Sequence, residues 1–150
     1  MKRAQCLVTR GKQVLMVKHR HAGEEWWCLP GGGVEPQETA EAAALRELNE
    51  ECCALGKIER QTAAYTDGLG FETITFLINI QNQEPQMGTD PEFSKENQIL
   101  AELRWMSLAE IPERDRAYLW AAGLLIIPEF LDEVSSWGDA LSYPAEETKV

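Results

Sequence analysis

Short runs in which hydrophobic and polar residues alternate cover much of the chain, and turns rich in glycine, proline or polar residues separate them. This pattern predicts the strands of a β-sheet. The first two runs, Lys2 to Thr9 and Gln13 to Arg20, are joined by Arg10-Gly11-Lys12 and are predicted to form a hairpin. Both faces of the second run are apolar, so we expect that strand to be covered on both sides. Further strands are predicted at residues 24–29, 57–65, 71–82 and 99–106.

The spacing of apolar residues becomes helical after a glycine turn at residues 30–33 and continues to about Ala54. Positions three or four apart lie on one face of a helix, so this face is predicted to turn toward a core. It carries Leu45, Leu48, Cys52 and Leu55.

A second helical segment is predicted at residues 113–127, and Pro128 is expected to end or kink it. The same spacing continues through Phe130, Leu131, Val134 and Trp137. We expect these apolar residues to cover the sheet; a remainder left exposed would instead indicate a homodimer contact.

The first predicted helix also has an acidic face. Glu47, Glu50 and Glu51 project from nearly one bearing, with Cβ atoms about 5–6 Å apart. Three like charges this close repel, and a hard divalent cation would neutralise them; carboxylate oxygens suit Mg²⁺ or Mn²⁺ better than zinc. The alternative is an ordinary surface helix with solvated acids. We disfavour it because Glu38 and Arg46 are also in place and the glycines stand where a loop must pass close to a ligand.

From Gly32 onward the chain resembles the Nudix box, GX5EX7REUXEEXGU, and the preceding WCLPGG resembles the approach to that box in the family. The positions in register are Gly32, Glu38, Arg46, Glu47, Leu48, Glu50 and Glu51. One fixed position differs, because Cys53 stands where the pattern has glycine, and Ala54 fills the following aliphatic slot. We interpret that glycine as a helix-terminating residue, so Cys53 affects the end of the helix rather than the chemistry.

The resemblance implies an α/β sandwich in which a mixed sheet lies between helices, as one domain over residues 1–150. The part that resembles the family ends near residue 111, residues 112–140 are expected to be helical, and residues 141–150 to form a flexible tail. The implied reaction is hydrolysis of a phosphoanhydride bond in a nucleoside diphosphate linked to a moiety X, by metal-activated water. No feature of the sequence separates nucleoside triphosphates, oxidised nucleotides, ADP-ribose, nucleotide sugars and dinucleoside polyphosphates.

The resemblance also implies roles for residues of the box. Glu47, Glu50 and Glu51 are expected to hold Mg²⁺ or Mn²⁺, and Gly31 to contribute a backbone carbonyl. Glu47 is also the candidate general base, although members of the family differ in which acid activates the water, so the choice stays open. Arg46 is expected to orient the carboxylates through bidentate contact, with Glu38 supporting it from the start of the helix.

Substrate contacts are expected outside the box. Lys18 and Arg20 place positive charge near the glycine turn, where a phosphate contact and a solvated strand end are equally open interpretations. The substrate is expected to be a nucleotide whose base stacks on an aromatic residue; the candidates are Trp26, Trp27, Tyr65 and Phe71.

A further metal ligand is expected in the long polar segment at residues 83–98, since a long loop in a small domain is often functional. Glu96 is our choice, because Lys95-Glu96-Asn97-Gln98 resembles the corresponding loop of members that cleave nucleoside triphosphates. Glu102 is the runner-up, although a strand position more often serves packing or an ion pair. For Glu96 a plain surface charge is an equally open interpretation.

Amino-acid composition narrows the range of expected binding partners. With 14 basic and 25 acidic residues the net charge is −11, which argues against binding to a nucleic-acid polymer or an anionic membrane. The apolar stretch after Met1-Lys2-Arg3 is too short for a signal peptide, so a cytoplasmic location is expected. The four cysteines lack CxxC spacing and are expected to be reduced thiols that serve packing. His19 and His21 have no third soft ligand nearby, so we expect them at a strand end facing solvent or substrate.

The intact acids of the box favour an enzyme. The alternative is a non-catalytic Nudix domain that binds a nucleotide and regulates a partner. A purely structural domain would not explain why three mutually repelling carboxylates lie together.

Overall fold

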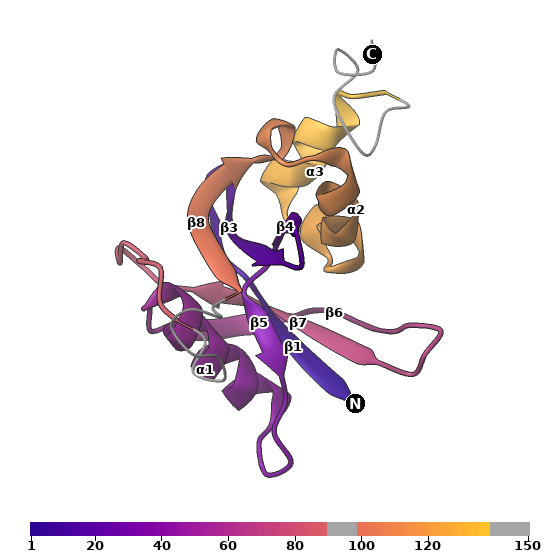
Figure 1. The fold of residues 1–150 in the computed structure, drawn as a ribbon. Coiled ribbons are helices and arrows are strands. Elements are labelled where there is room, and N and C mark those ends of the chain that lie inside the picture. Colours follow the sequence, from indigo (N-terminus) through magenta and orange to yellow (C-terminus); the bar gives the residue numbers. More distant parts are fainter. Residues whose placement is uncertain (90–98, 139–150) are drawn as a thin grey trace.

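The computed structural model describes residues 1–89 and 99–138. Its first sheet has the strand order β5-β1-β7-β6, with β1 and β7 parallel and the other neighbouring pairs antiparallel. The bounds of these strands are Lys2–Leu7 for β1, Gly31–Gly33 for β5, Lys57–Thr66 for β6 and Glu72–Asn79 for β7. The glycines predicted to form a turn are therefore an edge strand, and the turn follows them (Figure 1).

The second sheet is antiparallel, and β3 pairs with β2, β4 and β8. Its strands are β2 at Thr9–Arg10, β3 at Gln13–His21, β4 at Glu24–Cys28 and β8 at Leu100–Ser107. Of the first predicted run, Val8 and Thr9 meet the second run: Thr9 pairs with Val14, and the carbonyl of Val8 accepts the N–H of Leu15. Arg10, expected in the turn, pairs with Gln13 as part of β2. The remainder of the first run is β1, which pairs with β5 and β7 instead, because alternation along a strand does not specify its partner.

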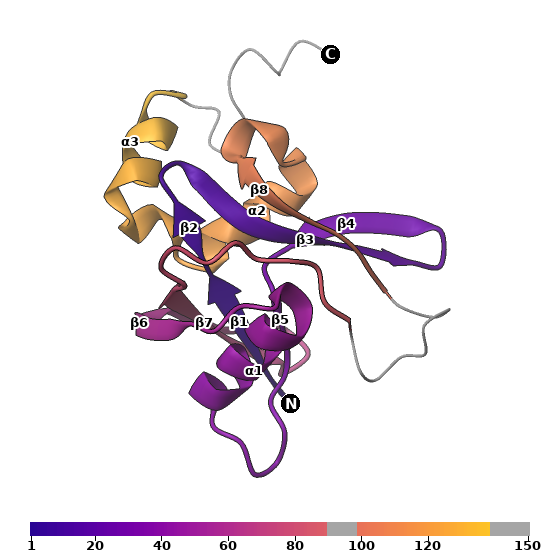
Figure 2. The ribbon, with the colours of Figure 1, turned by 90° about the vertical axis from the view of Figure 1, so that its left-hand side faces the viewer.

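Helices cover the sheets from two sides. Helix α1, Ala40–Cys52, packs against β1 and β5, whereas α2, Glu113–Ala121, and α3, Pro128–Ser135, lie on the side remote from α1 (Figures 1 and 2). Short 3-10 turns, η2 at Leu108–Glu110 and η3 at Leu124–Ile126, connect these elements. The arrangement is an α/β sandwich, as predicted.

The helix predicted at residues 113–127 begins where expected but ends early, at Ala121. The chain turns at Gly123, whose φ of 88° favours glycine, and a Cβ there would lie 2.6 Å from the carbonyl oxygen of Thr62. The Thr62 hydroxyl donates a hydrogen bond to the carbonyl of Ala122 at 2.7 Å, which holds the break in place. Pro128 begins α3 rather than ending a helix, a position in which its missing N–H is harmless.

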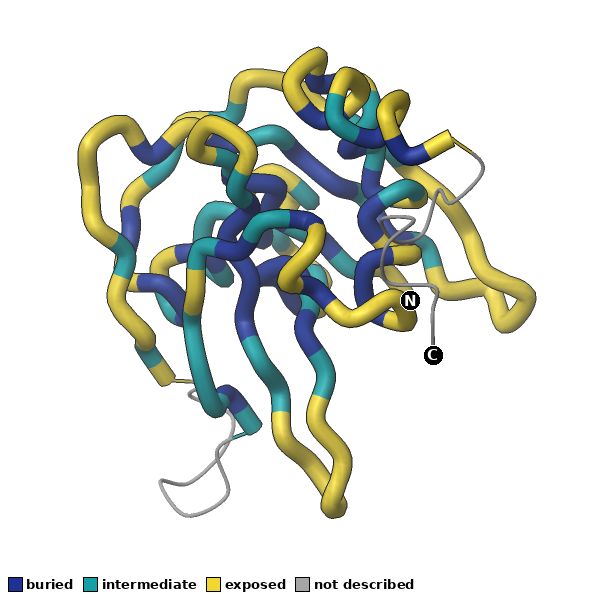
Figure 3. The backbone as a smooth tube through the Cα atoms, turned by 90° about the horizontal axis from the view of Figure 1, so that it is seen from above, coloured by how far each residue is buried: buried dark blue, intermediate teal, exposed yellow. Residues whose placement is uncertain are grey.

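Two hydrophobic cores lie on opposite faces of β3, in the buried interior of Figure 3. Val14 and Met16 belong to the core beneath α2 and α3, whereas Leu15 and Val17 belong to the core beneath α1. The prediction that this strand is covered on both sides is confirmed. Residues Phe130, Val134 and Trp137 are buried in the first core, as expected for a sheet cover.

A few residues lie elsewhere than predicted. Leu55 is 73% exposed, because it follows the end of α1 instead of extending its apolar face. Strand β7 stops at Asn79 rather than at residue 82, since Gln81 has a φ of 56° and donates its N–H to the Asn79 side chain.

Leu131 remains 47% exposed, and the homodimer stays a prediction. The predicted tail, residues 141–150, lies outside the described residues. Within those residues, no helix is long and apolar enough to cross a membrane.

Candidate functional site

The ends of α1 fix the position of its acids. The Thr39 hydroxyl caps the helix by accepting the N–H of Ala42 at 3.1 Å. At the other end Cys53 adopts the left-handed conformation, with φ 52° and ψ 40°, and donates its N–H to Asn49 at 3.0 Å. The interpretation of this position as the helix terminator is confirmed. The side chain of Cys53 makes that conformation more strained than it would be for the glycine of the pattern.

Residues 86–89 form a strap across the last turn of α1. The N–H groups of Gln86, Gly88 and Thr89 donate to carbonyls of this turn at 2.8–3.1 Å; the acceptors are Cys52, Glu51 and Glu50, respectively. A Cβ on Gly88 would lie 1.9 Å from the Glu50 carbonyl oxygen, so only glycine fits there. The strap therefore satisfies carbonyls that a helix end leaves unpaired, directly behind the acidic residues.

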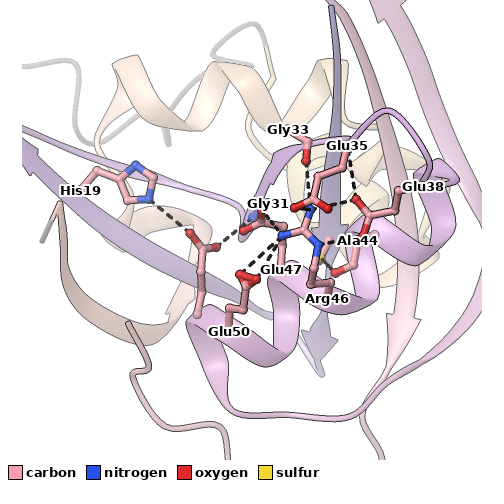
Figure 4. Close-up of polar contacts among 11 residues, drawn as sticks. His19, Gly31, Gly33, Glu35, Glu38, Ala44, Arg46, Glu47 and Glu50 are labelled. Carbon is pink, nitrogen blue, oxygen red and sulfur yellow. Dashed lines mark hydrogen bonds and ion pairs between the residues drawn. The ribbon is translucent and has the colours of Figure 1, made fainter. Parts of the chain in front are cut away.

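Arg46 gathers three carboxylates of the box, as Figure 4 shows. It binds Glu38 in a bidentate manner, with Nε 2.7 Å and Nη2 2.9 Å from the two carboxylate oxygens. Its Nη1 donates to Glu47 at 3.0 Å and to Glu50 at 3.1 Å. Nη2 also donates to the carbonyl of Gly33 at 3.0 Å, which ties α1 to β5. The geometry predicted for Arg46 and Glu38 is thus present.

Glu51 is held separately from the other acids. Its side chain is only 6% exposed, and Oε1 accepts the N–H of Gly31 at 2.9 Å. Its Oε2 lies 3.9 Å from Nε2 of His19, which extends from β3 (Figure 4). Gly32 gives Glu47 its space, because a Cβ there would lie 2.3 Å from Glu47 Oε1. The glycines of β5 therefore allow the acids of α1 to approach the sheet.

Charge on this face is unevenly balanced. Hydrogen bonding to Arg46 lowers the pKa of Glu38 below its ordinary value, and the same contact raises the pKa of the Arg46 guanidinium. The Arg46 guanidinium pairs with Glu35, Glu38, Glu47 and Glu50, and Glu51 adds a further carboxyl group nearby. The face therefore has more acidic than basic groups, which suits it to a cation.

The chemistry of these donors fits a hard divalent cation, since all three proposed side-chain ligands are carboxylates. In residues 1–89 and 99–138, however, no three His, Cys, Asp or Glu side chains already converge as a metal site. Glu47 and Glu50 point to Arg46, and Glu51 points to Gly31 and His19. Binding of a cation would require carboxylate oxygens of these side chains to move toward one point.

A cavity of about 440 Å³ lies on the other side of β1 from α1. Trp26, Trp27 and Tyr65 line it, which brings together three of the four residues predicted to stack on a base. Phe71, the fourth, is 42% exposed and is not part of the lining. Trp27 is buried in the core, while Trp26 stands edge-on to His19 with ring centroids 5.7 Å apart.

The model of the NUDIX domain matches residues 1–126. The chain belongs to the Nudix family. Among curated proteins it is similar to diphosphoinositol polyphosphate phosphohydrolase 2 of Rattus norvegicus, with 45% identity over 39% of this chain and 34% of that protein. It also matches diphosphoinositol polyphosphate phosphohydrolase 3-alpha of Homo sapiens, with 34% identity over 59% of this chain and 46% of that protein. The matched region thus spans less than half the length of either relative.

Solved structures show the same fold at low identity. A MutT Nudix hydrolase from Burkholderia pseudomallei superposes with a TM-score of 0.67 at 20% identity, covering 84% of this chain and 97% of that one. A C. elegans Ap4A hydrolase superposes with a TM-score of 0.61 at 19% identity, covering 89% of this chain and 98% of that one. At these identities the likeness establishes the fold of the Nudix domain.

The cations predicted to contact phosphate already have acidic partners. Lys18 Nζ lies 3.6 Å from carboxylate oxygens of both Glu25 and Glu102, and Arg20 forms an ion pair with Glu25. Phosphate contact by Lys18 or Arg20 stays a prediction. Glu102 forms ion pairs with Lys18 and Arg104, and its role as a further metal ligand stays a prediction. Glu96 lies outside the described residues.

Sequence reasoning missed several residues that the Nudix fold places near these sites. His19 and Glu51 are far apart along the chain, so no sequence pattern predicted their contact. Arg3, Arg114, Asp115 and Tyr118 line the cavity beside the predicted aromatic residues. For the strap at residues 86–89, the one sequence feature that could have indicated a close backbone contact was Gly88 within a polar segment. The four cysteines form no disulfide, as predicted; Cys6 and Cys52 are buried, whereas Cys53 is exposed and does not serve packing.

Proposed function

We propose that the chain is a metal-dependent pyrophosphohydrolase that cleaves a phosphoanhydride bond in a nucleoside diphosphate linked to another moiety. The observation that supports this proposal best is the contact of one guanidinium with Glu38, Glu47 and Glu50, beside a Glu51 fixed by Gly31. An ordinary surface helix has no need of so many buried or half-buried acids around one arginine. Organised carboxylates of this kind serve a site that must hold a cation against a polyphosphate.

Each residue of the box has a proposed task. Glu47, Glu50 and Glu51 hold Mg²⁺ or Mn²⁺, with the carbonyl of Gly31 as a further ligand. When bound, the cation neutralises phosphate charge and lowers the pKa of water. Arg46 sets the directions of Glu47 and Glu50, and Glu38 holds the arginine. Glu47, which stands against Gly32 and accepts a hydrogen bond from Arg46, takes the proton of the attacking water.

The names of similar proteins support the reaction class. They describe phosphohydrolases of diphosphoinositol polyphosphates, an Ap4A hydrolase and an ADP-ribose pyrophosphatase. These names do not agree on one substrate. The proposal for this chain is therefore the shared chemistry, with a nucleotide-type small molecule as substrate, while a homodimer stays a separate prediction.

A hydrolysis screen tests the proposal. The substrates are nucleoside triphosphates, oxidised nucleotides, ADP-ribose, nucleotide sugars, dinucleoside polyphosphates and a diphosphoinositol polyphosphate, each with Mg²⁺, Mn²⁺ or a chelator, with identification of products. We expect cleavage of at least one nucleotide class that the chelator abolishes. Metal-independent cleavage, or cleavage only of the inositol compound, would contradict the proposal. Nucleotide binding without turnover of any compound would favour a regulatory Nudix domain instead.

A further inference from the structure

A buried carboxylate faces the cavity between α2 and β4. Asp115, in the first turn of α2, is only 4% exposed. Its Oδ2 accepts the backbone N–H of Trp27 at 2.9 Å, and its Oδ1 accepts Nε of Arg114 at 3.1 Å. Arg114 also donates Nη2 to the carbonyl of Glu25 at 2.8 Å. These contacts fix the carboxylate at the junction of the helix and the strand, which lie side by side in Figure 1.

The rest of the lining suits a flat, uncharged ring. The cavity volume of about 440 Å³ falls within the range of about 300–1,000 Å³ that is usual for small-molecule sites. Trp26, Trp27, Tyr65 and Tyr118 supply aromatic surface. In the described residues the lining contains two cations, Arg3 and Arg114, and Arg114 is engaged by Asp115. A densely phosphorylated ring would find little positive charge here.

The carboxylate of Asp115 keeps the capacity to accept further hydrogen bonds. An ionised carboxylate has about four acceptor positions. Among the described residues, the protein uses one position on each oxygen. One position therefore remains on each of two adjacent oxygens, and such a pair matches two adjacent N–H donors on a planar ring.

Among common nucleobases, guanine presents this pair of donors at N1–H and its 2-amino group. Hypoxanthine keeps N1–H and lacks the amino group. Adenine presents an amino donor beside a ring nitrogen acceptor, which a carboxylate repels. Uracil has a single N–H between two carbonyl acceptors. Asp115 therefore discriminates among bases by the number of adjacent donors that each one offers.

We infer that the cavity binds a guanine base through Asp115, so that Asp115 determines the base specificity of the nucleotide. As far as cleavage is concerned, this inference rests on the proposed function. The cavity adjoins the acidic face across β1 and β5, because Gln5 lines the cavity and is paired with Gly31, whose N–H holds Glu51. A second link runs from Cys28, also in the lining, through His19 to Glu51. A base in the cavity thus leaves its phosphates near the box.

Binding of nucleoside monophosphates tests the inference without turnover, because these compounds contain no phosphoanhydride bond. GMP, IMP, AMP and UMP are titrated against the whole protein, and binding is followed by tryptophan fluorescence and calorimetry. Hydrogen bonds to a charged group are worth a discrimination of about tenfold or more each. We expect GMP to bind at least about tenfold more tightly than AMP, with IMP between them.

Asp115→Asn sharpens the test, since the asparagine oxygen can still accept the Trp27 N–H while its NH₂ group, in the place of Oδ1, opposes one of the two guanine donors as well as Arg114 Nε–H. The affinity for GMP should fall about tenfold or more, and the affinity for AMP should not fall. Asp132→Asn is the matched control, because Asp132 is exposed on α3 and its replacement changes the charge in the same way. It should leave the affinity for every nucleotide unchanged.

Equal binding of GMP and AMP to the native protein would overturn the inference, even if the variant fails to fold. An equal loss of both ligands in folded Asp115→Asn would also overturn it, because Asp115 would then only tie α2 to β4. A preference for GMP without hydrolysis of any nucleotide would contradict the proposed function alone. Hydrolysis of nucleotides without a base preference would contradict only the role of Asp115.

Discussion

The acidic face and the aromatic cavity are built in opposite ways. The acidic face comes from one continuous stretch, residues 31–51, in which a glycine strand and the following helix hold charged groups. The cavity is lined by residues that range from Arg3 in β1 to Leu119 in α2. A local site follows from spacing along one helix, whereas a dispersed site exists only after the two sheets and α2 have come together.

The two regions also differ in the property that substitutions should change. Carboxylates and one guanidinium dominate the acidic face, so changes there should act on turnover. Aromatic rings and one engaged carboxylate dominate the cavity, so changes there should act on binding. Substitutions in the two regions should therefore separate effects on kcat from effects on KM.

The largest effect is expected from Glu50→Gln and Glu51→Gln. Each change removes a charged ligand from the proposed metal site, so turnover should fall by orders of magnitude. Both variants should stay folded, because the amide oxygen at residue 51 can still accept the Gly31 N–H and like-charge repulsion decreases. Steady-state kinetics and thermal unfolding check this. Glu41→Gln, an exposed residue of the same helix, is the control. Full activity in both variants would contradict the proposed role of Glu50 and Glu51 as metal ligands.

A smaller loss is expected for Arg46→Lys. Lysine keeps the charge but cannot bind Glu38 in a bidentate manner while also reaching Glu47 and Glu50. Loss of such a supporting contact should reduce metal affinity or activity by about 10–100-fold. Metal titrations of kcat measure the effect, with Arg60→Lys, exposed on β6, as control. Unchanged metal dependence would show that Arg46 does not orient the acids.

Alanine substitutions in the cavity should raise KM without abolishing turnover. Stacking is binding energy remote from the bond that is cut, so Trp26→Ala and Tyr65→Ala should weaken binding. Trp27→Ala should also destabilise the protein, because Trp27 is part of the core. Phe71→Ala is the matched control, since Phe71 does not line the cavity. If KM changes only for Phe71→Ala, the base is held outside the cavity.

The ion pair between Arg46 and Glu38 should make a pH-dependent contribution to stability. The pKa of Glu38 is lowered in the folded protein, so its contribution is present above the unfolded pKa of about 4.3. It should be lost as the pH falls through the lower folded pKa. Unfolding of the native protein and Glu38→Gln, compared from pH 8 to pH 3, measures this. A stability difference that grows on acidification would contradict the assignment.

The smallest functional effect is expected for Cys53→Gly. Glycine adopts the left-handed conformation of this position without the strain that a side chain brings, so the protein should gain about 1 kcal/mol of stability. Activity should stay within a small factor. Denaturant unfolding and kcat test the two parts separately. A large change in turnover with unchanged folding would give Cys53 a chemical role.

Much of the acidic face was predictable because its contacts are local. Regular spacing on α1 brings Arg46 to Glu47 and Glu50, and the register of the box places Glu38 within reach. The role of Cys53 as helix terminator and the two-sided burial of β3 also followed from sequence patterns. In each case neighbouring positions carried the information.

Tertiary structure alone decided the partners of these elements. Alternation in residues 2–9 predicted a strand, but pairing with β7 depends on residues far along the chain. Similarly, Thr62 and Gly123 break the predicted C-terminal helix, and the strap at Gly88 meets α1 across a loop. Asp115 joined Trp26 and Tyr65 only because α2 docks beside β4. Local spacing along α1 set the chemistry of the helix, whereas the packing of distant segments formed the cavity, because long-range contacts leave no periodic trace in a single sequence.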